Sequence, residues 1–138
     1  MRTKHQNQIL NARKTSGKHA YTDRDMNEDT YKLRRKVINI IYQAKKLIPE
    51  LPRVEVRISD INGFSGLGWL NTNVIRIDAR HTNMSEHKLK KLVYHEIGHS
   101  VLGLEHDDNC FIMHQGWKRQ DEFTHSRLDA RLKEMFVK

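Results

Sequence analysis

The chain of 138 residues contains a single cysteine, Cys110, and only two prolines, and its apolar runs are only a few residues long. A single cysteine excludes an internal disulfide framework of the kind that small secreted domains use. The short apolar runs exclude a transmembrane helix, which needs about 20 consecutive apolar residues. The basic N-terminal stretch also lacks the apolar core of a secretory signal peptide. These absences predict a cytoplasmic protein that has no membrane partner.

Aromatic residues make up only 7% of the chain, whereas charged residues make up 30% and leave a net charge of +8. The positive charge is concentrated in the first 20 residues and between Lys32 and Lys46. Such an excess can attract nucleic acid, but aromatic residues do not interleave with these charges in a stacking pattern. We therefore expect a solvated tail and a solvated helix face, with nucleic acid as the less favoured partner.

Residues 1–24 lack hydrophobic periodicity and are rich in Lys, Asn, Thr and His. This composition predicts a flexible basic N-terminal tail. The remaining residues, 25–138, are long enough to bury one hydrophobic core, and they contain no internal repeat. They are predicted to form a single domain.

The first half of that domain is predicted to hold a helix and a strand. Asp25 begins a stretch that resembles a capping box, and apolar residues recur at helical spacing from Leu33 to Ile48, before two prolines end the helix. Apolar and polar residues alternate over residues 54–59, which is typical of a half-buried strand. The glycine-containing stretch 62–68 is expected to be a loop.

A second strand and two helices follow. The strand, residues 74–78, comes after a turn signal at 71–73 that indicates a hairpin or a sheet edge. Ser85 can cap the next helix, and Gly103 is expected to end it in a left-handed conformation. A C-terminal helix is predicted to start near Thr124.

One segment, residues 95–106, carries a pattern of metal ligands with the sequence HEIGHSVLGLEH. Because residues four apart share one face of a helix, His95 and His99 can bind a single metal ion. Glu96 follows the first histidine, where its carboxylate can act as a general base on water at the metal. His106 supplies a third nitrogen, and zinc in catalytic sites favours three protein ligands and an open fourth position. The segment therefore predicts Zn²⁺ as the cofactor.

The alternative interpretation of this segment is a core helix whose imidazoles are satisfied by ordinary hydrogen bonds. Three histidines and an adjacent glutamate are an unfavourable way to build a core, because every buried polar group needs a partner. We therefore favour the metal site.

The segment resembles the metzincin group of zinc endopeptidases, whose pattern is HExxHxxGxxH followed by a methionine turn. Residues 111–114, with the sequence FIMH, resemble the methionine turn of the astacins, and the similarity covers about residues 74–136. The resemblance implies that the three histidines bind zinc, that Glu96 is the base and that Met113 lies beneath the metal. His114 is expected either to line the pocket or to face solvent.

The resemblance also implies the architecture. The expected α+β fold is a minimal zincin-like domain, with a small mixed sheet, an N-terminal helix, a metal-binding helix, a methionine turn and a C-terminal helix. In the metzincins the edge strand before the metal helix pairs with an extended substrate. That role is assigned here to residues 74–78, which would bind a peptide by adding a strand to the sheet.

The chain departs from the family pattern by one residue. Five residues separate the second and third histidines in the family, whereas six separate His99 from His106. By strict counting Glu105 occupies the position of the third ligand, and the glycine has moved from position 102 to Gly103. One residue added before the turn explains both shifts and favours His106, although zinc accepts both imidazole and carboxylate. The shifted spacing is similar to that of short metallopeptidase-like proteins of bacteria and phages.

The predicted function is that of a zinc metalloendopeptidase, which hydrolyses a peptide or protein substrate by means of activated water with Glu96 as the base. One alternative is a zinc-dependent endoribonuclease of the rRNA-maturation type, because those enzymes use three histidines at similar spacing followed by an aspartate, as in His106-Asp107. They generally lack a glutamate at the place of Glu96. A non-catalytic module that keeps zinc for its structure is the third interpretation.

Overall fold

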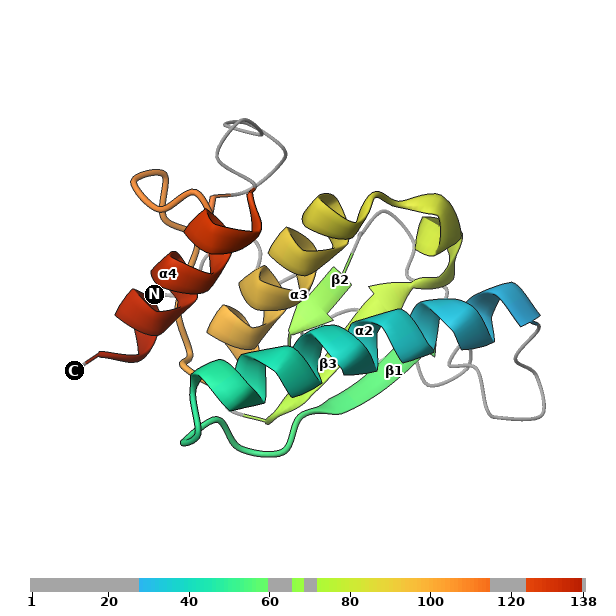
Figure 1. Ribbon diagram of the computed structural model, residues 1–138, viewed down its shortest axis with the longest axis horizontal. Coiled ribbons are helices and arrows are strands. Elements are labelled where there is room, and N and C mark those ends of the chain that lie inside the picture. Colours follow the sequence, from blue (N-terminus) through green and yellow to red (C-terminus); the bar gives the residue numbers. More distant parts are fainter. Residues whose placement is uncertain (1–27, 60–65, 69–71, 115–123, 138) are drawn as a thin grey trace.

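The computed structural model (Figure 1) describes residues 28–59, 66–68, 72–114 and 124–137. The helices and strands follow in the order α2 (Glu28–Leu47), β1 (Glu55–Ser59), β2 (Gly66–Gly68), β3 (Val74–Asp78), the 3₁₀ segment η1 (Ala79–Asn83), α3 (Glu86–Ser100) and α4 (His125–Phe136). This content confirms the predicted α+β class. The tail predicted for residues 1–24 and the capping residue Asp25 lie outside the described residues.

Helix α2 buries one side, as its apolar spacing predicts. Its buried residues recur every three or four positions and are Thr30, Leu33, Val37, Ile40 and Ala44. Two acidic residues begin the helix and Lys45 and Lys46 end it, an arrangement that complements the helix dipole. Lys45 Nζ also donates to the carbonyl oxygens of Pro49 and Leu51, each at 2.5 Å, just beyond the end of the helix.

The three strands form a mixed sheet in the order β1-β3-β2. β1 runs parallel to β3, with Val56 opposite Ile75 and Ile58 opposite Ile77, whereas β2 runs antiparallel to β3. The mixed sheet and the hairpin-like pairing of β2 with β3 agree with the sequence expectation.

Two predictions about this sheet are wrong. The stretch 62–68 is not entirely loop, because residues 66–68 form β2. The glycines of β2 gave no alternating pattern, but a strand can be held by its backbone bonds to a neighbour alone. The strand 74–78 is not an edge strand, because β3 lies between β1 and β2. Its backbone is paired on both sides and cannot accept a peptide strand.

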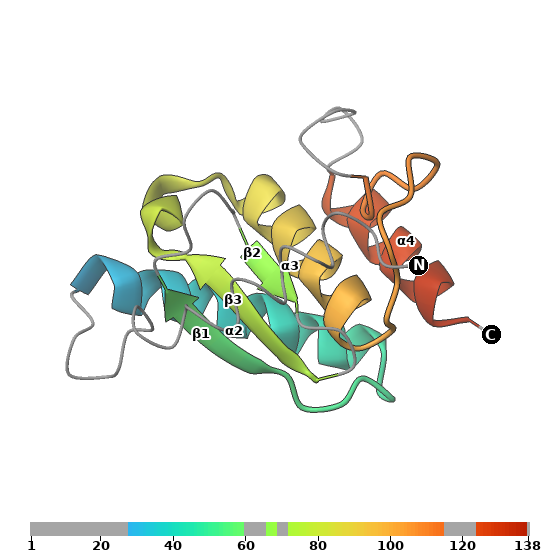
Figure 2. The same ribbon diagram turned by 180° about the vertical axis from the view of Figure 1, so that it is seen from behind.

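Helices α2 and α3 cover the same face of the sheet, with α2 over β1 and α3 over β2 and β3 (Figures 1 and 2). The core between these two layers is formed by apolar side chains of β1, β3, α2 and α3. From the sheet it includes Val56, Ile58, Ile75 and Ile77, and from the helices Leu33, Val37, Leu89, Val93 and Ile97.

Helix α4 packs against the outer side of α3 (Figure 1). Thr124 caps it, since its hydroxyl oxygen accepts from Arg127 N at 3.2 Å, which confirms the predicted start. Asp129 links the two helices, because its carboxylate accepts from the Tyr94 hydroxyl at 2.7 Å and pairs with Lys90 Nζ at 2.8 Å. None of the described helices combines the length and the apolar content that crossing a bilayer requires.

Candidate metal centre

Helix α3 carries the first two histidines in the middle of the molecule. Ser85 caps it as predicted, with its hydroxyl oxygen 3.4 Å from Lys88 N. Every residue from Leu89 to Ser100 is buried, because the sheet, α2, α4 and the turn after the helix surround it. The polar residues of this helix therefore point into the protein, where each needs an internal partner or a ligand.

The three predicted zinc ligands converge. Each of His95, His99 and His106 offers a ring nitrogen, and these atoms all lie within 4.8 Å of one another. The ring centroids are 4.7 Å apart for His95 and His99, 5.1 Å for His95 and His106, and 4.9 Å for His99 and His106. Two rings come from consecutive turns of α3 and the third from the chain that follows it.

Hydrogen bonds at the Nδ1 atoms of His95 and His99 fix the orientation of these two rings, so that their Nε2 atoms face the centre of the cluster. His95 Nδ1 donates to the carbonyl oxygen of Ile112 at 2.7 Å, and His99 Nδ1 donates to that of Leu104 at 2.5 Å. A carbonyl oxygen can only accept, so each Nδ1 carries the proton and each Nε2 of a neutral ring presents a lone pair. Such backbone bonds are typical of histidines that bind metals.

The distance between the two Nε2 atoms fits a zinc ion. They lie 3.1 Å apart, and two lone pairs at that distance repel each other unless a cation or a proton lies between them. Two nitrogens at about 2.05 Å from a tetrahedral zinc ion are roughly 3.3 Å apart. The donor set of three imidazoles is also one that zinc prefers.

The end of α3 is wider than a common helix terminus. Gly103 has a φ of 66°, the left-handed conformation predicted for it. Gly103 N donates to the carbonyl oxygen of His99 and Leu104 N to that of Gly98, at 3.1 and 2.9 Å. These bonds span four and six residues, one more than the three and five of the common Schellman end. This wider terminus is where the one residue beyond the metzincin spacing would be accommodated.

The two candidates for the third ligand, His106 and Glu105, lie differently in the turn after this terminus. His106 is half-buried and belongs to the converging group, whereas Glu105 is exposed and does not. Of the two residues, only His106 has the geometry of a ligand.

The methionine turn closes the site from one side. Asp107 N donates to the carbonyl oxygen of Met113 at 3.1 Å, so the chain returns to the position of His106. Met113 is 1% exposed and packs on α3 at Gly98, where a Cβ atom would lie 2.4 Å from the methionine sulfur. Gly98 stands between the two helix histidines in sequence, so Met113 supports the part of the helix that carries them.

His114 lies beside the histidine cluster but is not part of it. Its side chain is 13% exposed, and its Nε2 is 3.7 Å from Asp108 Oδ1. It lowers the pKa of His106 through its charge, which places it within electrostatic reach of that ring. His114 therefore is mostly enclosed rather than solvent-facing.

Burial sets the charge state of the cluster. It is the largest cause that lowers the pKa of His95, His99 and His106, and it brings that of His99 to about 4. The neighbouring rings and Lys91 lower these pKa values further, while the hydrogen bond to Leu104 opposes the shift in His99. A neutral imidazole is the form that binds metals, so these rings need not release a proton at neutral pH.

Two charged residues accompany the histidines inside the protein. Glu96 is 2% exposed, and Lys91 is 4% exposed. Lys91 Nζ donates to the carbonyl oxygen of His114 at 3.2 Å. Burial lowers the pKa of Lys91 to about 8, although the carboxylate of Glu96 favours its charged form.

The sequence interpretation did not consider Lys91. The available signal was its position four residues before His95, which places both on one face of a helix. That signal alone does not distinguish a buried lysine from one whose side chain reaches solvent.

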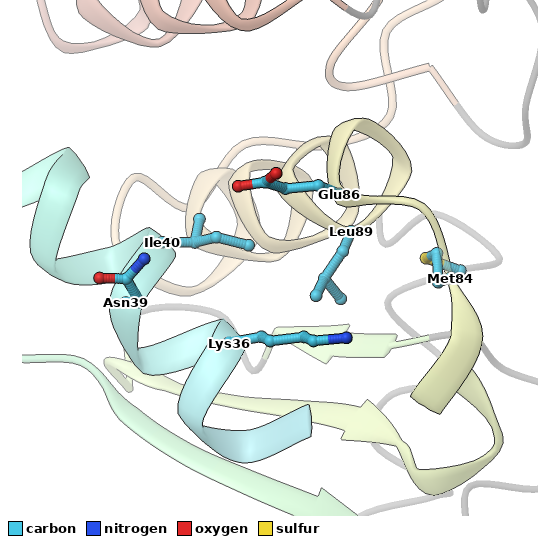
Figure 3. A pocket seen from close by; sticks show the side chains of 6 residues that line it. All are labelled: Lys36, Asn39, Ile40, Met84, Glu86 and Leu89. Atoms are coloured by element: carbon cyan, nitrogen blue, oxygen red, sulfur yellow. The ribbon is translucent and has the colours of Figure 1, made fainter. Parts of the chain in front are cut away.

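A hollow of about 300 Å³ lies elsewhere, where α2 meets the start of α3 (Figure 3). Its lining residues come from α2, from the end of η1 and from the first turn of α3, and they are Lys36, Asn39, Ile40, Met84, Glu86 and Leu89. None of them belongs to the histidine cluster, which occupies the other half of α3. The hollow and the candidate metal centre are therefore separate features.

Comparisons with protein-family models, with curated proteins and with solved structures found no match for this chain. The resemblance to the metzincins accordingly rests only on the sequence motif of residues 95–106 and the methionine of residues 111–114. The structure itself supports the coarser description, an α+β domain with a mixed sheet in which three histidines of one segment converge.

Proposed function

We propose that this protein is a zinc-dependent metalloendopeptidase, with His95, His99 and His106 as the metal ligands and Glu96 as the general base. The observation that carries the proposal is the convergence of three neutral imidazoles within 4.8 Å, two of them oriented by backbone carbonyls. In a purely structural core, unprotonated ring nitrogens that converge on one point would lack a hydrogen-bond donor, which is unfavourable.

The residues of the chain divide the chemistry between them. Zinc at this site would activate a water molecule as the nucleophile and polarise the scissile carbonyl. Glu96 would accept the proton of that water and deliver it to the leaving nitrogen. Its carboxylate is buried next to the first ligand in sequence, away from competing bulk water. Met113 holds the helix that orients the ligands.

An extended peptide would bind along β2 rather than β3. β3 is paired on both sides, whereas β2 has one strand neighbour within the described residues. β2 also lies against α3, the helix that carries Glu96 (Figure 2). Main-chain bonds to its outer edge would bring a scissile bond toward the histidines.

The decisive experiment compares two substrates and two matched variants. Purified protein is incubated with casein and with a structured RNA, with and without a chelator, and its zinc content is measured by mass spectrometry. We expect about one zinc per chain and chelator-sensitive cleavage of casein. Glu96→Gln should keep the zinc but lose about 10²–10⁴-fold in rate. Glu105→Gln makes the same chemical change on an exposed residue and should retain full activity.

Each other outcome rejects a defined part of the proposal. Full activity of Glu96→Gln contradicts the role of the base. Cleavage of RNA in place of casein identifies the endoribonuclease, and bound zinc without either activity identifies a structural zinc module.

A further inference from the structure

The outer side of α2 presents aromatic, apolar and basic side chains in one row. Tyr31, Arg35, Ile38, Tyr42 and Lys46 are spaced by four, three, four and four residues, so they share a face of the helix. We call this row the outer stripe. All five residues are exposed, and the face opposite to them carries the buried residues of α2. No described element covers the front of α2 in Figure 1.

The exposed apolar surface of the described chain is concentrated on this stripe. Tyr31 is 52% exposed, Ile38 40% and Tyr42 58%, and the remaining large hydrophobic residue of that kind, Val137, is close to the C-terminus. Single exposed apolar residues are common, but several gathered in one patch mark an interaction site. A merely solvated helix face would carry polar residues at these positions.

The charge of the stripe selects the kind of partner. Two cations, Arg35 and Lys46, lie on the stripe, whereas Glu28, three residues before Tyr31, pairs with Lys32 Nζ at 3.3 Å. Residues 31–47 hold four further lysines and arginines beside the stripe and no aspartate or glutamate. Lys46 Nζ lies 4.7 Å from the centre of the Tyr42 ring, so cation and aromatic face occur side by side. At this pair an aromatic residue does lie beside a positive charge, contrary to the expectation that none interleaves with the charges in a stacking pattern, because helical spacing brings together residues that are separated in the sequence.

We propose that the outer stripe of α2 binds single-stranded nucleic acid. Tyrosine rings and arginine stack on unpaired bases, whereas lysine and arginine contact the phosphates. The stripe extends over 16 residues of helix, or about 22 Å, long enough to follow several nucleotides. The surface is separate from the metal centre, and its binding does not depend on zinc or on hydrolysis.

The first test measures electrostatics with a matched pair of charge reversals. The full-length chain is titrated onto a fluorescein-labelled 12-nucleotide oligouridylate, and fluorescence anisotropy is followed at several salt concentrations. Arg35→Glu lies on the stripe, and Arg127→Glu makes the same change at an exposed position of α4. We expect Arg35→Glu to weaken binding about tenfold and to lower the salt slope by about 0.7. Arg127→Glu should weaken binding less than about twofold. Equal effects of both reversals would overturn the proposal, since the affinity would then depend on the net charge of the protein and not on the outer stripe.

The second test asks whether the tyrosines stack on bases. Tyr42→Ala should weaken binding about tenfold, while Tyr42→Phe, which keeps the ring, should bind as the wild type does. Equal affinity of the alanine variant and the wild type would contradict stacking. A duplex RNA of the same length hides its bases and should bind less tightly than the single strand. Tighter duplex binding, or full displacement of the oligonucleotide by polyglutamate at equal charge, would overturn the proposal in favour of another acidic partner.

Discussion

Helices α2 and α3 are the two longest described helices, with 20 and 15 residues, and they differ in where their polar residues lie. α2 buries a single face and exposes its charges, whereas α3 is buried on all sides from Leu89 to Ser100. A charge on α2 is solvated and weakly constrained. A charge or an imidazole on α3 is buried away from solvent, so a partner in the protein or a ligand must compensate its lost hydration.

The difference suits the two helices to the two different kinds of site that we propose for them. α3 holds its polar groups at defined distances, as the proposed metal centre requires, because buried side chains have few rotamers available. The side chains on the outside of α2 are free to adapt, which suits a long, flexible partner. Substitutions on α3 should therefore change metal binding and stability together. Substitutions on the outer stripe should change nucleic-acid binding without changing stability.

The largest expected effect is the loss of a metal ligand. His106→Ala should weaken zinc binding by more than about 100-fold, since even residues that only orient a ligand contribute 10–100-fold. Glu105→Ala removes the neighbouring exposed carboxylate and should change the affinity less than about twofold. Competition with a chromophoric chelator measures both. A larger effect of Glu105→Ala would reverse the assignment of the third ligand.

A second effect concerns the stability of the metal-free protein in acid. The pKa of His99 is about 4 in the folded chain, against 6.5 as its usual value. Unfolding therefore takes up a proton at pH values between these two, and the free energy of unfolding falls as the pH falls from 6.5 to about 4. The loss from this ring alone is about 3 kcal/mol.

Urea unfolding of the chelated protein at a series of pH values measures this change. His99→Gln, which cannot ionise, serves as the control and should show a correspondingly flatter dependence. A stability that is constant from pH 7 to pH 4 would contradict the buried neutral ring.

The third effect concerns the contact between α3 and the methionine turn. A Cβ at position 98 would meet the Met113 sulfur at 2.4 Å, so Gly98→Ala should cost about 1–3 kcal/mol and lower the melting temperature. The clash should shrink in a Met113→Ala background, which a double-mutant cycle would show as coupling. Ser100→Ala removes a buried hydroxyl of α3 that has no hydrogen-bond partner among the described residues, so it should cost less than Gly98→Ala. Independent effects of the Gly98 and Met113 substitutions would exclude the contact.

The smallest expected effect distinguishes Lys91 from an ordinary buried residue. Its charge repels a cation bound by the three histidines, so Lys91→Met should strengthen zinc binding by roughly 1 kcal/mol, about fivefold, at pH 7. Because the pKa of Lys91 is about 8, the wild type loses this charge at higher pH. The advantage of the variant should disappear by pH 9. Weaker zinc binding by Lys91→Met at pH 7 would show that the lysine supports the site through its hydrogen bond to His114.

Much of the local structure followed from the sequence because it depends on neighbouring residues. The spacing of Leu33 and Val37 on α2, the cap at Ser85, the start of α4 near Thr124 and the left-handed Gly103 were all predicted and are confirmed. These features involve interactions within one or two helical turns.

The predictions that failed depended on contacts between distant segments. The pairing of residues 66–68 with β3 could not be deduced from a stretch without alternating residues. The central place of β3 follows from its parallel pairing with β1, about 20 residues earlier in the chain. The row of tyrosines and cations on α2 was overlooked because its members are separated in the sequence.

The sequence by itself determined the candidate metal ligands and the type of each major helix, since both are properties of short segments with a fixed period. The tertiary structure alone decided that His106 joins the other two rings, that Lys91 and Glu96 are enclosed with them, and that β2 rather than β3 lies at an edge of the described sheet. The physical reason is that burial and convergence depend on how the chain returns to α3 after Gly103, and that path is set by packing and by backbone hydrogen bonds of the turn.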